Sequence, residues 1–429
     1  MSSQIGLLER GLHVQAHCQR VAALAGEIAG LLGLAAEPRL LLEQAALVHH
    51  VTLETFKTTA LDRLVTDVCG GDWCVTGSKA GCRESFGLLG QAADLVRAMR
   101  HRGRSEADAQ TALLAGILEA ANLFDERLQL LPYEDITAEQ IRRDLASLAR
   151  EGYWPPAVAS AFERLWLVRD NDIREAVQQL PVFPSVVFKA LALSADSNAN
   201  LAQLEKLLAS DQVLAGQLIR AANVGLNGAR QPVASIPQAA AFLGLEMSRK
   251  VIAAAALKPL VASAELRTLW RHSLETAERM ESLAAGTGEI PPIEAYLAGL
   301  VHDVGRLVLL RSRGEAARFY ARLIERGCPP VFAEYVLAGR DHGEIGAAVL
   351  SAWRFPGHIR EAVRYHHRPE KSASALTSLL YCAEQDAGED SPSGVRLDYA
   401  AARAGSAVER AASELPASAE TMEQLIAVA

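Results

Sequence analysis

The chain has 429 residues, of which 50% are hydrophobic and 22% charged, and its formal net charge is −8. This length suggests two or three domains, and the composition argues against a disordered protein. The acidic balance argues against a nucleic-acid binder, because such proteins carry a basic surface. The sequence begins without the apolar core of a signal peptide and has no apolar run long enough to cross a bilayer, so we expect a cytoplasmic protein without membrane contact.

Hydrophobic residues recur at helical spacing in nearly every segment, and only 5% of the residues are aromatic. Ala and Leu, which favour helices, supply much of the apolar content, and we therefore predict an all-α fold. Thr137 followed by Gln140 is a candidate capping box at a helix start. In the first part of the chain we predict helices at residues 17–34, 40–51, 91–100, 106–123, 137–151 and 157–167.

A polar stretch at residues 168–182, which runs into Pro181 and Pro184, predicts a domain boundary. Glycines and prolines then separate short segments with a helical pattern, and one such break falls at Gly244. The stretch from residue 388 to 416 is rich in Ala, Ser and Gly, which is typical of a loop. Beyond the boundary we predict helices at residues 201–208, 211–222, 235–243, 249–257 and 418–428.

The histidines fall into two clusters, separated by a histidine-free stretch from residue 102 to 271. Each cluster contains a His that opens an amphipathic helix, His17 or His272, and a later buried helix that ends in LVHHV or LVHDV. The spacing is similar in both, because 49 − 17 = 32 and 302 − 272 = 30. A buried His–Asp pair is costly unless it is paired or metal-bound. Histidines from two helices could therefore converge with this Asp on a divalent metal, and imidazole ligands suit Fe and Zn.

These residues resemble the HD superfamily of metal-dependent phosphohydrolases. Residues 173–388 resemble the HDOD domain, a relative of the HD-GYP phosphodiesterases, through the segments LPVFPSVVFKALAL, LAGLVHDVGRLVLL, DHGEIGAAVLSAWRFP and AVRYHHRP. Residues 1–167 resemble a degenerate HD or HD-GYP-like domain, through His17, LVHHV and the acidic segment around Asp125. The resemblance implies two HD-superfamily-like helical domains, followed by a tail at 389–429 with a final helix.

For the second domain, the resemblance implies a metal site that would hold Fe, Mn or Zn. Arg306 would be its catalytic residue if the domain hydrolyses phosphodiesters, because it could stabilise charge on the phosphate. No GYP motif follows the double histidine, which argues against hydrolysis of cyclic-di-GMP. Asp386 is an alternative to Glu384 as the last acidic ligand. The implied ligands are His272, His302, Asp303, His342, His366, His367 and Glu384.

In the first domain, His50 stands where the resemblance expects the bridging Asp. A neutral imidazole cannot bridge two cations as a carboxylate does, so we expect no binuclear site there and interpret the domain as a structural or dimerisation module. His358 is expected to be a surface or packing residue. The degenerate site would consist of His17, His49, His50, His101 and Asp125.

We therefore expect a bacterial signal-transduction protein whose HDOD domain is an output or binding module without phosphodiesterase turnover. Its partner would be a signalling protein or a small nucleotide, and a homodimer is compatible with the sequence. Two alternatives stay open at this point. The first is a metal-dependent phosphohydrolase that acts on a nucleotide or cyclic dinucleotide, and the second is a protein-interaction scaffold without a small ligand.

Overall fold

The structure is a computed structural model that describes residues 2–49, 91–92, 94–96, 98–99, 108–131, 136–181, 183–193, 199–225, 232–261, 266–311 and 314–385. Every regular element in these ranges is a helix, which confirms the predicted all-α class. No described helix is both long and apolar enough to span a membrane. Contacts divide the chain into two compact units, Met1–Arg169 with Gly314–Arg340 and Asp170–Arg313 with Asp341–Ala429.

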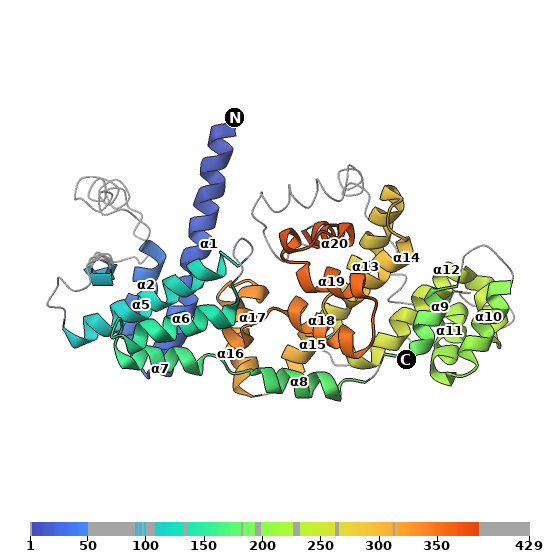
Figure 1. The fold of residues 1–429 in the computed structure, drawn as a ribbon, viewed down its shortest axis with the longest axis horizontal. Coiled ribbons are helices and arrows are strands. Elements are labelled where there is room, and N and C mark those ends of the chain that lie inside the picture. Colours follow the sequence, from blue (N-terminus) through green and yellow to red (C-terminus); the bar gives the residue numbers. More distant parts are fainter. Residues whose placement is uncertain are drawn as a thin grey trace, which may run out of the picture. The chain divides into compact units, whose positions relative to one another are not determined.

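In the first unit α1 packs against α2, α5 and α7 (Figure 1). Residues 314–340 belong to this unit although they lie inside the range predicted for the second domain. The buried Glu27 of α1 accepts a hydrogen bond at 2.8 Å from Arg322, which lies in that segment. The helices are α1 (Ser2–Leu31), α2 (Ala36–Val48), α5 (Ala109–Leu128), α6 (Ala138–Arg150), α7 (Pro156–Arg164), α16 (Glu315–Glu325) and α17 (Pro330–Ala338).

Side-chain caps fix where helices of the first unit begin. The Thr137 hydroxyl accepts from the backbone N–H of Gln140 at 3.1 Å, so the predicted N-cap is confirmed. The Gln140 side chain donates to Asp144 at 3.2 Å instead of reaching back to the cap. Asp108 caps α5 in the same way, by accepting from two backbone N–H groups of the first turn. Helix α1 begins at Ser2, well before the predicted start at His17, because the helical pattern extends to both sides of that residue.

In the second unit α13 packs closely on α14, while α18 packs on α15 and α19. Helix α20 covers α13 and α19 (Figure 1). The helices are α8 (Asp170–Gln179), α9 (Ser185–Leu191), α10 (Ala199–Leu208), α11 (Gln212–Gly225), α12 (Ile236–Leu257), α13 (Arg267–Thr287), α14 (Pro292–Val301), α15 (Val304–Arg311), α18 (His342–Ala352), α19 (Gly357–Tyr365) and α20 (Ala375–Gln385), with 3-10 turns at Lys258–Val261 and Pro369–Lys371.

Two predicted breaks have different outcomes. The helices expected at 235–243 and 249–257 are the two halves of α12, which is interrupted at Gly244 with a φ of 77°. The polar stretch at 168–182 contains a helix, α8, which packs on α15 and α18. Its buried face includes Ile173. The polar composition of the rest of the stretch led us to predict a boundary there and no helix. The tail at 389–429, with its final helix, lies outside the described residues, and the predicted domain limits stay a prediction.

Candidate metal centre

His272 and His302 meet because α13 and α14 approach closely at Gly299. A Cβ atom at residue 299 would lie 2.7 Å from the Cα of Ala277 in α13, so only glycine allows this approach. His272 lies in α13, and His302 directly follows α14. Their Nε2 atoms are 3.2 Å apart and their ring centroids 5.1 Å apart. The two helices thus bring residues 30 positions apart into one cluster.

A second close approach, at Gly305, brings α15 against the start of α18. A Cβ atom there would lie 2.6 Å from the backbone nitrogen of Gly346. Asp303 directly precedes α15 and His342 is the first residue of α18. Asp303 Oδ1 therefore lies 3.0 Å from His342 Nε2. Asp341 caps α18 by accepting from the third residue of the helix, which fixes the turn that carries His342.

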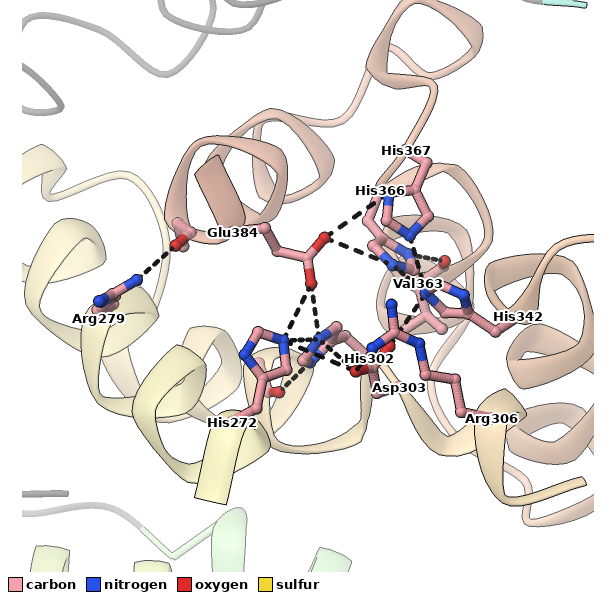
Figure 2. A network of polar contacts seen from close by, with 12 residues as sticks. His272, Arg279, His302, Asp303, Arg306, His342, Val363, His366, His367 and Glu384 are labelled. Atoms are coloured by element: carbon pink, nitrogen blue, oxygen red, sulfur yellow. Dashed lines mark hydrogen bonds and ion pairs between the residues drawn. The ribbon is translucent and has the colours of Figure 1, made fainter. Parts of the chain in front are cut away.

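The remaining ligand candidates come from the ends of α19 and α20. His342 Nε2 lies 3.1 Å from His366 Nε2 and 2.8 Å from His367 Nε2. Glu384 connects these histidines to the first pair, because its Oε1 is 2.7 Å from His302 Nε2 and its Oε2 is 3.7 Å from His366 Nε2. Figure 2 shows Glu384 between the two groups of histidines.

The distances between the nitrogen and oxygen atoms of the cluster suit ligands of a shared metal ion. Two ligands that each lie about 2.0–2.1 Å from one ion are about 2.8–3.4 Å apart at right or tetrahedral angles. The short separations here run from 2.7 to 3.2 Å. Among the described residues, the groups with all ligand atoms within 4.8 Å of one another are His342–His366–His367, His272–His302–Glu384 and Asp303–His366–Glu384.

Second-sphere hydrogen bonds orient two of the imidazoles as ligands. His302 Nδ1 donates to the carbonyl of Gly299 at 2.6 Å, and His366 Nδ1 donates to that of Val363 at 2.5 Å. An imidazole that is neutral and donates from Nδ1 presents the lone pair of Nε2. Both Nε2 atoms point into the cluster (Figure 2).

The surroundings of the Asp303 carboxylate are those expected of a metal ligand. Its side chain is 1% exposed, and neither carboxylate oxygen makes a hydrogen bond of good geometry to any described group. Arg306 Nη1 and His342 Nε2 each lie 3.0 Å from one of the two oxygens. Burial would raise the pKa of Asp303, but the charges of Arg306, His302 and His342 hold this pKa well below its usual range. The carboxylate is therefore ionised and could serve as a metal ligand.

The histidines differ in their proton affinity. Burial lowers the pKa of His366 to about 4 and that of His367 well below its ordinary value, so both are neutral near pH 7. Burial also acts to lower the pKa of His302, but Asp303 and Glu384 outweigh it and raise that pKa well above its ordinary value. A metal ion would have to displace this proton, since only the neutral ring can coordinate.

Two arginines hold the supporting loops in place. Arg368, which follows the double histidine, lies 3.2 Å from the Asp341 carboxylate, so the loop after α19 is tied to the start of α18. Arg279 donates to the carbonyl of Ala383 at 3.3 Å, which ties α20 to α13 beside Glu384 (Figure 2). Such second-sphere contacts decide how accurately the ligands are placed.

The first unit has a smaller cluster with a similar histidine pair. His17 Nε2 lies 3.1 Å from His49 Nε2, and the Asn122 Oδ1 lies 3.0 and 2.8 Å from these two atoms. His17 Nδ1 lies 2.6 Å from Asp125, which Arg20 binds through two hydrogen bonds at 2.6 and 2.9 Å. Burial would raise the pKa of Asp125, but hydrogen bonds from His17 and Arg20 lower it. Burial lowers the pKa of His49.

The structure thus brings together all seven predicted ligands of the second unit and three predicted residues of the first. His50, His101 and Asp386 lie outside the described residues. Sequence reasoning missed Arg20 and Asn122. A signal for both existed, because each lies three residues along a helix from a predicted site residue and so shares its face. His358 is 48% exposed and pairs with Glu294 at 3.1 Å. It is therefore a surface residue and is not one of the buried cluster residues.

Comparison with known proteins identifies part of the chain. Residues 180–369 match the family model of the HDOD domain, so the chain carries an HDOD domain in this region. An uncharacterised protein of Treponema pallidum is 24% identical over 217 residues, which are 49% of this chain and 42% of that protein. The chain therefore matches less than half of the length of this relative. The family of the first unit is not identified by these matches.

Solved structures are similar to part of the chain. An HDOD domain protein of unknown function from Geobacter sulfurreducens is 25% identical, with a TM-score of 0.48, and the match covers 59% of this chain and 97% of that one. A protein of Shewanella amazonensis, provisionally named a phosphohydrolase, is 24% identical with a TM-score of 0.46 over 59% of this chain and 98% of that one. A protein of Marinobacter aquaeolei, provisionally named a signal transduction protein, is 21% identical with a TM-score of 0.48 over 60% and 64%.

Proposed function

We propose that the second unit is a metal-binding HDOD domain that acts as a regulatory binding module in signal transduction, without phosphodiester turnover. One observation carries the metal site: five imidazoles and two carboxylates from five places in the chain converge in one buried cluster, with donor separations that suit shared ions. The ligands would be those of the resemblance, and Fe, Mn or Zn matches their imidazole and carboxylate chemistry.

Burial supports binding rather than turnover. No ligand side chain of the cluster is more than 10% exposed, and those of His302, Asp303, His342 and His366 are 0–1% exposed. A phosphodiester would have to reach an ion in this cluster, and active sites normally open into a cleft that receives the substrate. A closed, charged cluster of this kind could instead fix the arrangement of α13, α14 and α18–α20 that a partner protein or a nucleotide recognises.

The experiment is metal analysis of the full chain, purified anaerobically with metals present. We expect at least one equivalent of Fe, Mn or Zn in the wild type, and a lower metal content in the variant that combines His302→Ala with Asp303→Ala. His358→Ala is the matched control, because it removes an exposed imidazole of the same unit and should leave the metal content unchanged. A wild type without metal after this purification would contradict the proposal.

A second candidate function, metal-dependent phosphohydrolysis, is favoured by Arg306. Its guanidinium lies beside the shared carboxylate of Asp303, where a cation could stabilise charge on a bound phosphate. Metal ions in this cluster would supply a water of lowered pKa and polarise the phosphoryl oxygens. Assays of the metal-loaded chain with bis(p-nitrophenyl) phosphate and with cyclic dinucleotides separate the two functions. Turnover that disappears in Asp303→Asn would establish the hydrolase, and binding without turnover would support the regulatory module.

A further inference from the structure

The cluster of the first unit contains three electron-pair donors that face one another. The Nε2 atoms of His17 and His49 and the Oδ1 of Asn122 form a triangle with sides of 3.1, 3.0 and 2.8 Å. These lengths match the spacing of about 2.8–3.4 Å expected for ligands of one ion. The triangle is also more regular than the one formed by His272, His302 and Glu384, whose sides are 3.2, 3.6 and 2.7 Å.

Neighbouring groups determine which atoms form this triangle. His49 Nδ1 donates to the carbonyl of Ala46 at 2.6 Å, and His17 Nδ1 donates to Asp125 at 2.6 Å. A ring that is neutral and donates from Nδ1 turns the lone pair of Nε2 toward its partners, and a carboxylate or carbonyl in this position is the usual second-sphere partner of a metal-bound histidine.

Glu126 determines the orientation of the amide. Asn122 Nδ2 donates to Glu126 Oε1 at 3.0 Å, so the amide oxygen faces the two imidazoles. The reverse orientation would place the amide oxygen against the Glu126 carboxylate, which is unfavourable. Two imidazole nitrogens and one amide oxygen then converge, and a cation at their centre would stabilise the arrangement. The site is largely enclosed, since His49 is 2% and Asn122 9% exposed.

We propose that His17, His49 and Asn122 hold a single divalent transition-metal ion in the first unit. Asp125 is a positioning residue here rather than a ligand, because Arg20 engages both of its oxygens and His17 Nδ1 contacts one of them. This arrangement explains how one ion can bind without the carboxylate bridge that a binuclear site requires. Imidazole and amide oxygen together suit Zn²⁺, Co²⁺ or Fe²⁺. Water could complete the coordination beside these three described donors.

The test is a Co²⁺ titration of the metal-stripped full chain, followed by the visible absorption bands of the bound ion. The background variant is His302→Ala/Asp303→Ala/His342→Ala, which removes one ligand from each of the three ligand groups of the second unit so that the first unit can be measured. We expect this background to retain one equivalent of Co²⁺, and the further change Asn122→Ala to weaken that binding by at least about 10-fold. Asn122→Asp should bind more tightly than the parent, since a carboxylate oxygen replaces the amide oxygen.

If the combined variant does not fold, Asn122→Ala is made as a single change in the otherwise wild-type chain. The absorption bands of the ion in the first unit then appear as the difference between the spectra of the wild type and of this variant. His358→Ala controls for weak surface binding and should change nothing. Equal Co²⁺ affinity in the parent, Asn122→Ala and Asn122→Asp would overturn the proposal. The test distinguishes the proposals for the two units. If the second unit binds no ion, His302→Ala/Asp303→Ala/His342→Ala has no effect on the amount of bound Co²⁺, whereas Asn122→Ala still weakens Co²⁺ binding.

Discussion

The two units contain nearly the same histidine pair in different electrostatic surroundings. The Nε2 atoms are 3.1 Å apart in the first unit and 3.2 Å apart in the second, with ring centroids at 5.1 Å in both. In each pair the later histidine donates from Nδ1 to the carbonyl three residues before it, at 2.6 Å. The same helix geometry therefore recurs, although the residues around it differ.

The difference lies in where the negative charge is placed. In the second unit Asp303 and Glu384 lie among the imidazoles, and neither Asp303 oxygen makes a good hydrogen bond to the described part of the chain. In the first unit Asp125 lies behind the pair and is neutralised by Arg20. Arg20 thus binds both oxygens of the Asp125 carboxylate, whereas Arg306 lies 3.0 Å from one oxygen of Asp303 and metal ions would supply further positive charge there. A histidine pair of the same geometry therefore occurs in two different charge environments.

The largest expected effect is that of removing the arginine from the first unit. Arg20→Met leaves Asp125, which is 0% exposed, as a buried charge that keeps His17 as its hydrogen-bond partner among the described residues. Breaking a buried pair in this way costs about 3–5 kcal/mol. Urea unfolding should show this loss, and the metal content of the second unit should not change. The control is Arg143→Met, which removes a pair of exposed groups, Arg143 and Glu139, and should cost less than about 1 kcal/mol. Equal losses in both variants would contradict the role assigned to Arg20.

A somewhat smaller effect is expected from acidification of the metal-stripped chain. The pKa of His366 is about 4, below its unfolded value of 6.5, so the unfolded state binds the proton first. Its contribution to stability is present above pH 6.5 and is lost as the pH falls toward about 4, a change on the order of 3 kcal/mol. Urea unfolding at several pH values should show this slope, and His366→Gln should reduce it. An unchanged slope in the variant would place the titrating group elsewhere.

The smallest effect concerns the loop that carries the double histidine. Arg368→Met removes the contact with Asp341 that ties this loop to α18. Second-sphere changes of this kind lower metal affinity by about 10- to 100-fold. Competition with a chelator should measure the loss, and Arg368→Lys should recover part of it. The first unit should keep its Co²⁺ affinity, and a parallel loss there would indicate general destabilisation instead.

The sequence predicted the helical class, because apolar periodicity is a local pattern, and the family resemblance named the seven residues that the structure gathers in the cluster of the second unit. It did not predict that residues 314–340 join the first unit, because this depends on tertiary contacts such as the ion pair between Arg322 and Glu27. Arg20 and Asn122 were missed because their roles depend on which face of α1 meets α5, and that is a tertiary contact. Helix α8 was missed because its polar residues dominate the composition, while a single buried face holds it to α15 and α18.

Anomalous diffraction from crystals grown with metal tests the central claim most directly, with data collected at the absorption edge of the ion. The account predicts peaks in the second unit within about 2.0–2.3 Å of His302 Nε2 and of the Asp303 carboxylate. The His342–His366–His367 group should lie at the same distance from a peak. Well-diffracting crystals with no peak inside the second unit, or with peaks only at exposed side chains such as His358, would contradict it.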